Sequence, residues 1–206
     1  MAEPVLNEHD LDPLAGLPDD HPRRLLVDAA IRHLDGATIG EVSLAAVASE
    51  AGLGRSTLYR AFPNGRDELL RAALAAEVAR FWRGLAEAVA EEATLEGRLI
   101  RGLMEGVRRT EEHALLQRLV RHEAHQLAPM LDELEPVVYG LMVAYTEDLL
   151  DRFSDQLVDE VNRHEAAQYL ATMILSYIGS PAGLDFGDEA AVAQLVRTQL
   201  LGGLLR

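Results

Sequence analysis

The stretch from residue 43 to residue 62 constrains the fold more than any other part of the chain. Its sequence is SLAAVASEAGLGRSTLYRAF, in which Ala48, Gly52 and Leu58 follow one another at spacings of four and six. Two short helices that meet at a glycine need a small residue where they cross, a turn residue that tolerates positive φ, and an apolar anchor on the second helix. These three residues meet those needs, so the spacing predicts a helix-turn-helix.

The second helix of this pair, predicted over residues 54–61, has an apolar and a polar side. Leu58 and Phe62 lie one turn apart and are expected to face inward, and Pro63 ends the helix because it disfavours the α conformation at Phe62. The outward side then carries hydroxyl and guanidinium groups, which bind bases and phosphates. We therefore predict DNA contacts for Arg55, Ser56, Thr57, Tyr59 and Arg60.

Helical periodicity continues along nearly the whole chain, and no segment shows the alternation of a strand. Ser43 is expected to cap the first helix of the helix-turn-helix and to lie among its DNA-contacting residues. Gly36 is expected to end the preceding helix, and breaks are expected near His113 and Pro129. The predicted helices cover 23–35, 44–51, 54–61, 66–92, 95–110, 113–127, 129–153, 162–178 and 188–204. The fold class predicted is all-α.

The charge is unevenly distributed. The formal net charge is −15, and all 19 basic residues are arginine. Residues 1–20 hold six acids and no base (−6), residues 21–80 hold eight arginines and seven acids (+1), and residues 81–206 hold 11 arginines and 21 acids (−10). Because DNA affinity depends on the charges that face the phosphates, a DNA-binding role is compatible with the segment 21–80. The total argues against non-specific DNA coating and against a membrane-surface role.

These patterns predict three parts: a disordered acidic arm at 1–20, a three-helix DNA-binding domain at 21–66, and a helical domain at 67–206 that binds a ligand and dimerises. The absence of cysteine excludes disulfides and cysteine-based metal sites. No apolar run is long enough for a membrane span, and the acidic N-terminus does not look like a signal peptide. We expect a cytoplasmic protein with no cofactor.

The stretch LAAVASEAGLGRSTLYRAFPNGRDELL resembles the signature of the tetracycline-repressor (TetR) family of bacterial regulators. The resemblance runs from about Leu25 to Leu70. It implies a homodimer that places two recognition helices on a near-palindromic operator, and a divergent ligand-binding domain. It also implies phosphate contacts for Thr57 and Tyr59, positions at or near the bases for Arg55, Ser56 and Arg60, and a phosphate contact for Arg66, the nearest match to a lysine usual in the family. Gly54 departs from the usual Ser or Thr cap of the recognition helix.

For the second half of the chain, the functional hypothesis is a ligand-binding pocket between helices that is apolar and carries scattered polar groups. Aromatic, methionine and histidine residues recur there at helical spacing, and for any single one of them ordinary core packing is the more common explanation. The absence of an inward basic cluster favours an apolar or weakly polar effector. The candidate ligand-binding residues are Trp82, Met104, His122, His125, Met142, Tyr145, Tyr169 and Met173.

The sequence raises three other interpretations. The cluster of His122, Glu123 and His125 lacks the HExxH spacing, so surface histidines are favoured over a metal site. No nucleophile-base arrangement, phosphate loop or paired carboxylates indicate an enzyme. A helical protein-interaction module without DNA binding stays open as the alternative. We predict a ligand-responsive repressor, and we expect the apolar helices 162–178 and 188–204 to pair with their mates in a homodimer.

Overall fold

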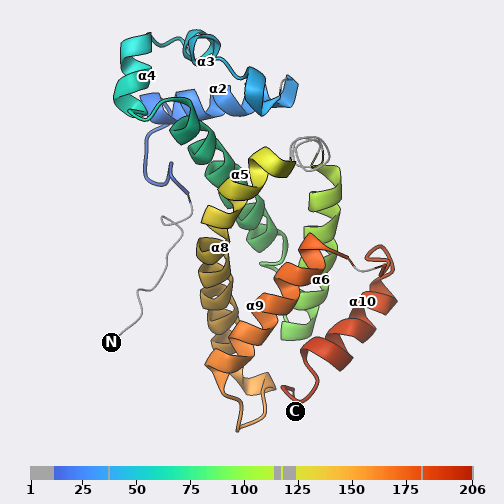
Figure 1. Cartoon of the computed structure of the whole chain (residues 1–206). Coiled ribbons are helices and arrows are strands. Elements are labelled where there is room, and N and C mark those ends of the chain that lie inside the picture. The colour runs from blue at the N-terminus through green and yellow to red at the C-terminus, as the bar shows by residue number, and fades with distance from the viewer. Residues whose placement is uncertain (1–11, 37, 114–116, 118–123, 182, 206) are drawn as a thin grey trace. The chain divides into compact units, whose positions relative to one another are not determined.

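The computed structural model describes residues 12–36, 38–113, 117, 124–181 and 183–205. Within these ranges the chain is helical, apart from loops and one isolated bridge between Leu157 and Leu205, so the all-α fold class is confirmed (Figure 1). None of the described helices is both long enough and apolar enough to cross a membrane. The elements are α2 (Pro22–Gly36), η1 (Ile39–Glu41), α3 (Leu44–Glu50), α4 (Arg55–Ala61), α5 (Arg66–Ala88), α6 (Leu95–Glu112), α8 (Ala124–Arg152), η2 (Ser154–Gln156), α9 (Arg163–Gly179), α10 (Glu189–Leu195) and the π-helical turn η3 (Val196–Leu200).

The chain divides into two compact units. The N-terminal unit comprises the described residues up to Arg80 and those from His113 to Pro136, and the C-terminal unit comprises Phe81–Glu112 and the described residues from Val137 onward. Residues 67–80 and 113–136, which the sequence analysis assigns to the C-terminal domain, pack in the N-terminal unit. The start of α5 supplies Leu69, Leu70 and Ala73 to its core, and Met130 and Leu131 pack against that core.

The core of the N-terminal unit joins α2, α3, α4 and the first half of α5. Leu26, Ala30 and Leu34 form the buried face of α2 at the helical spacing. Leu58 is 1% exposed, and Phe62, which follows α4, is fully buried. The three helices of the predicted DNA-binding domain are therefore held together by one continuous apolar cluster.

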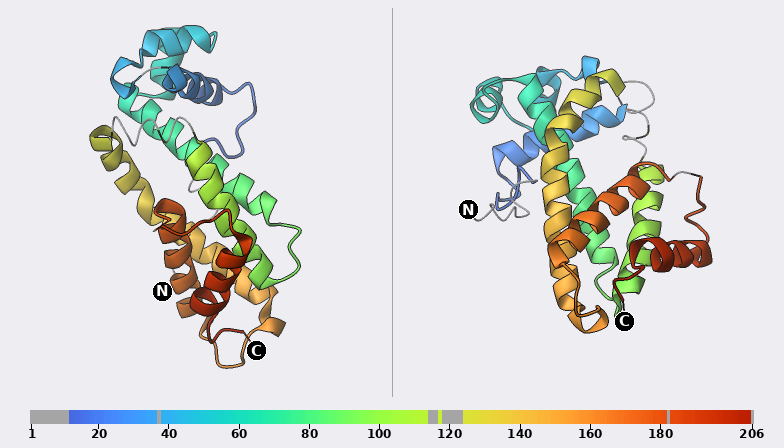
Figure 2. Two further views of the ribbon diagram at one scale, coloured as in Figure 1. Left: turned by 90° about the vertical axis from the view of Figure 1, so that its right-hand side faces the viewer. Right: turned by 60° about the horizontal axis from the view of Figure 1, so that its bottom comes forward.

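In the C-terminal unit, α9 and α10 both pack against α6 (Figures 1 and 2). The buried face of α6 repeats every four residues, at Leu95, Leu99, Leu103 and Val107. At Gly106 the approach is so close that an added Cβ would lie 2.5 Å from Ile178 Cδ1, so a larger residue at this crossing of α6 and α9 would force the Ile178 side chain to move. The predicted helical half therefore has its own core.

Two helices have bounds that differ from the predicted ones. A break was expected at Pro129, yet α8 runs from Ala124 through both Pro129 and Pro136. Both prolines are exposed, so water can satisfy the carbonyls that lose their helical partner. The predicted helix 188–204 is shorter than expected: after α10 the backbone widens into η3, where Leu201 N bonds Val196 O, and Gly203 then adopts φ +83°. The predicted helix 113–127 lies mostly outside the described residues.

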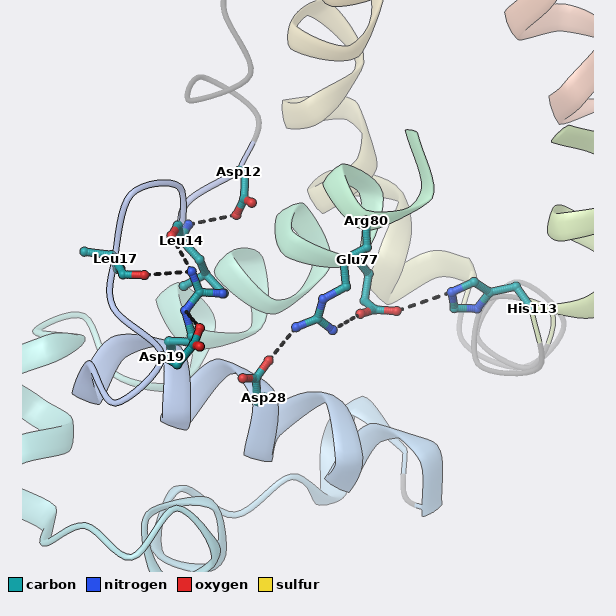
Figure 3. Close-up of polar contacts among 9 residues, drawn as sticks. Asp12, Leu14, Leu17, Asp19, Asp28, Glu77, Arg80 and His113 are labelled. Carbon is teal, nitrogen blue, oxygen red and sulfur yellow. Dashed lines mark hydrogen bonds and ion pairs between the residues drawn. The ribbon is translucent and has the colours of Figure 1, made fainter. Parts of the chain in front are cut away.

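The acidic arm also differs from its prediction over residues 12–20. Leu14 is only 2% exposed and belongs to the core of the N-terminal unit. Arg24 donates hydrogen bonds to the carbonyl oxygens of Leu14 (3.0 Å) and Leu17 (2.9 Å), and Leu14 N donates to Asp12 Oδ1 (Figure 3). The buried Leu14 side chain and the guanidinium of Arg24 hold this segment in place. The prediction of disorder rested on acidic composition, which does not show these two contacts. Residues 1–11 lie outside the described residues.

Candidate nucleic-acid interface

The turn between α3 and α4 has the geometry that the spacing of Ala48, Gly52 and Leu58 predicted. Gly52 adopts φ +68°, and Leu53 N bonds Ala48 O at 2.8 Å, as in a glycine-terminated helix. An added Cβ at Gly52 would meet nothing within 4 Å, so the backbone conformation, and not space, requires glycine here. Ala48 is 2% exposed at the crossing of the helices. The described structure therefore contains a helix-turn-helix.

The outer face of α4 carries the predicted DNA-contacting side chains. Arg55, Ser56, Tyr59 and Arg60 are exposed, with Tyr59 at 53%, and Thr57 is half-buried. Among the described residues, none of these five side chains has a hydrogen-bonding or ionic partner. Two guanidinium groups and three hydroxyls are therefore available to a ligand outside this part of the chain.

Ser43 and Arg66 lie at the starts of neighbouring helices. The Ser43 hydroxyl accepts a 3.5 Å hydrogen bond from Ala46 N and so caps α3, which leaves its own proton for donation elsewhere. Arg66 is half-buried at the start of α5, and its Nε is buried without a hydrogen-bond partner among the described residues. Neither position excludes the predicted DNA contact.

A chain of charges connects α2 with α5 and with His113 (Figure 3). Arg80 pairs with both Asp28 and Glu77, and His113 Nε2 lies 3.3 Å from Glu77 Oε2. The hydrogen bond from His113 lowers the pKa of Glu77, and Arg80 adds to this against the opposing effect of burial. The same hydrogen bond raises the pKa of His113, and the charge of Asp35 raises it further. The pair stabilises the N-terminal unit when both of its groups are charged.

This pair predicts a pH dependence of stability. Because the pKa of His113 is raised on folding, its contribution is complete below the ordinary pKa of 6.5 and is lost as the pH rises through the folded pKa. Glu77, with a lowered pKa, contributes until the pH falls through its folded value. We expect Glu77→Gln to cost on the order of 1 kcal/mol near pH 6, and less at pH 8.

Thermal unfolding of both proteins between pH 5.5 and pH 8 measures this difference. Part of it should persist at pH 8, because Arg80 still pairs with Glu77 there. Glu91→Gln is the control, since Glu91 is exposed and has no partner among the described residues. A difference between wild type and Glu77→Gln that stays constant with pH would contradict the prediction.

The predicted ligand-binding residues do not gather at one place. Trp82, Met104, Tyr145 and Met173 are half-buried against the core of the C-terminal unit, and Met142 is part of that core. Tyr169 is 44% exposed, and its hydroxyl donates to Gln199 O at 2.5 Å. His125 is exposed and belongs to the N-terminal unit, whereas His122 and Glu123 lie outside the described residues. Periodicity identified the apolar members but could not distinguish a pocket from a core.

A groove of about 480 Å³ lies beside α6 in the C-terminal unit. Of the predicted ligand-binding residues that the structure describes, only Met104 lines it. The groove is walled by Met104, Val107 and Leu184, with Arg101 and Glu111 among its charged lining residues. The groove could not be predicted from the sequence. One of its sides is formed by the loop 184–187, which is far from α6 in the chain and lies beside it only in the folded protein.

One residue that contacts the helix-turn-helix was missed by sequence reasoning. Arg23, at the start of α2, donates a hydrogen bond to the carbonyl oxygen of Ala61, the last residue of α4. The two residues are 38 positions apart, and no periodicity connects them.

Comparisons with known proteins agree with this geometry. The family model described as "Bacterial regulatory proteins, tetR family" matches residues 26–73, which include α3 and α4. No curated protein matches the sequence.

Among solved structures, a TetR-family regulator of Mesorhizobium loti MAFF303099 is similar, with 15% identity and a TM-score of 0.64 over 90% of this chain and 97% of the other. The TetR family repressor AlkX from Dietzia sp. strain DQ12-45-1b, implicated in biodegradation of n-alkanes, has 21% identity and a TM-score of 0.58 over 85% and 93%. The fatty acid degradation regulator FadR from Bacillus halodurans has 18% identity and a TM-score of 0.52 over 84% and 93%. These structures share the fold of the chain.

Proposed function

We propose that the chain is a DNA-binding transcriptional regulator of the TetR family, and that it represses transcription as a homodimer bound to a near-palindromic operator, from which a small effector releases it. The family and the fold point to a regulator rather than to an enzyme. The observation that carries the proposal is the outer face of α4, where Arg55, Ser56, Tyr59 and Arg60 are exposed and have no partner within the described chain.

In this proposal α4 enters the major groove, as the second helix of a helix-turn-helix does. Arg55 and Arg60 donate to base edges or phosphates, and the hydroxyls of Thr57 and Tyr59 donate to phosphates. Ser43 and Arg66 add phosphate contacts from the starts of α3 and α5. The acidic excess elsewhere in the chain lowers non-specific affinity, so binding depends on this face.

A stripe on α9 supports the homodimer. Tyr169, Met173 and Tyr177 follow one another on α9 at four-residue spacing, and the hydroxyls of the two tyrosines bond Gln199 of the same chain. These large side chains are half-buried or exposed in the single chain, and α9 with α10 can form a four-helix bundle with the same helices of a second copy. A dimer would then carry two α4 helices for two half-sites.

The effector we propose is apolar or weakly polar. Trp82, Met104, Tyr145 and Met173 offer apolar and phenolic surface at the edge of the core of the C-terminal unit. AlkX and FadR are connected with n-alkane and fatty acid degradation, which favours apolar compounds as the first to be examined. His125 does not support this site, because it is exposed and lies in the other unit.

The test is selection of duplexes from random-sequence DNA by the purified protein, followed by footprinting on the selected sequence. We expect a near-palindromic site whose half-sites lie one helical turn of DNA (about 34 Å) or a multiple of it apart. Light scattering should give twice the chain mass of 22.6 kDa. Apolar compounds that release the DNA should also change the fluorescence of Trp82, the single tryptophan. Enrichment of no sequence would favour the protein-interaction alternative.

A further inference from the structure

The recognition helix α4 is held differently at its two ends. At its N-terminus the cap is Gly54, which has no side chain to bond the first-turn N–H groups. Backbone bonds from Thr57 N and Leu58 N to Gly54 O start the helix there. The C-terminal end, in contrast, receives a side chain from another helix.

That side chain is Arg23 of α2. Its Nη1 donates a 2.8 Å hydrogen bond to Ala61 O, one of the last carbonyls of α4, which have no partner within the helix. Its guanidinium carbon lies 4.4 Å from the centroid of the fully buried Phe62 ring. A cation at this end is also favoured by the helix dipole.

Arg23 also reaches the helix that follows. Its Nη1 lies 3.6 Å from Glu68 Oε1 on α5, and the other carboxylate oxygen of Glu68 accepts a 2.9 Å hydrogen bond from Asn64 N. Glu68 therefore holds the turn between α4 and α5 while it pairs with Arg23. Among the described residues, the bond from Arg23 to Ala61 is the one side-chain hydrogen bond that joins α4 to another helix.

We propose that Arg23 is a positioning residue for DNA recognition, which sets the direction of α4 by fixing its C-terminal end and the turn to α5. The proposal rests on the proposed function, in which α4 contacts the bases. The side chain of Arg23 is 28% exposed, and its Nη1 is engaged by Ala61 O and Glu68, so in this proposal it acts through α4 and does not touch DNA. If Arg23 is absent, Arg55 and Arg60 remain available but lose their fixed approach to the base edges.

An arginine suits this position better than a lysine. Nη1 of the planar guanidinium donates to Ala61 O and forms an ion pair with Glu68, while the face of the group covers the Phe62 ring. A lysine ammonium can pair with Ala61 O and Glu68, but it has no planar face to cover the Phe62 ring at the same time. Arg23→Lys should therefore restore part of the function, and Arg23→Gln should restore less.

The experiment measures the affinity of Arg23→Gln and Arg23→Lys for an operator duplex selected by the wild-type protein and for a scrambled duplex. We expect the ratio of the two affinities to fall about tenfold to a hundredfold in Arg23→Gln, the range of a misplaced base contact, and less in Arg23→Lys. The slope of log Kd against log salt should not change, because no phosphate contact is lost. Arg24→Gln is the matched control, since Arg24 bonds Leu14 O and Leu17 O and not α4.

Three results would overturn the proposal. The first is an unchanged ratio of operator affinity to scrambled-duplex affinity in Arg23→Gln. If circular dichroism shows that Arg23→Gln has not folded, the same result in folded Arg23→Lys would overturn the proposal. The second is a loss of salt slope of about 0.9 per protomer, which would mean that Arg23 binds a phosphate itself. The third is an equal effect of Arg24→Gln. If the wild-type protein selects no sequence, the proposed function fails first, and that outcome is distinct from all three.

Discussion

Replacing Arg55 and Arg60 together by alanine should weaken operator binding by at least about a hundredfold while leaving a folded dimer. Each arginine that contacts a base or phosphate contributes about 1–3 kcal/mol, and a dimer loses four such side chains. Both residues are exposed on α4 and have no partner in the described chain, so their removal breaks no intramolecular contact. Fluorescence anisotropy of a labelled operator measures the loss.

The control for this prediction removes the same charge elsewhere. Arg101→Ala combined with Arg152→Ala takes two exposed guanidinium groups from the C-terminal unit. If net charge alone decided affinity, the two double variants would behave alike. Binding of the Arg55/Arg60 variant at wild-type strength would instead show that α4 does not contact the operator.

Replacing Phe62 by alanine should destabilise the N-terminal unit by about 3–5 kcal/mol, enough to unfold it in much of the population. Phe62 is fully buried, belongs to the core that joins α2, α3, α4 and α5, and lies under the guanidinium of Arg23. Truncation of Phe62 leaves a cavity in this core. We expect α4, which has only seven residues, not to shift far enough to fill it. Hydrogen exchange of the amides of α3 and α4 follows the N-terminal unit separately from the C-terminal one.

Tyr59 provides the matched control, because it is an aromatic residue of the same helix and is 53% exposed. Tyr59→Ala should change stability by less than about 0.5 kcal/mol, and it should weaken operator binding because it removes a phosphate donor. The two substitutions should thus separate folding from DNA contact. Equal stability of Phe62→Ala and wild type would show that Phe62 does not anchor α4.

The helix-turn-helix could be predicted because its determinants are local. Ala48, Gly52 and Leu58 act within eleven residues: one permits the crossing, one adopts positive φ, and one anchors the second helix. The exposed and buried sides of α4 then follow from helical periodicity, so the candidate DNA-contacting residues were identified before the fold was known. Whether each of them contacts DNA stays a prediction.

The second half of the chain was less predictable. Periodicity located most helices there, yet it could not foresee that α8 continues through Pro129, because the tolerance of an exposed proline depends on solvent around the freed carbonyl. It also could not separate pocket residues from core residues. Met142 and Tyr169 both lie on predicted helices, but one is 7% exposed and the other 44%.

The sequence by itself thus determined the helical class, the helix-turn-helix and the polar face of α4, since these depend on residues within a few turns of one another. Only the tertiary structure decided that Leu14 belongs to a core, that Glu77 pairs with His113, and that Arg23 closes the end of α4. Each of these contacts joins residues far apart in the chain. Their formation depends on how the helices pack, and no spacing along the sequence encodes such a distance.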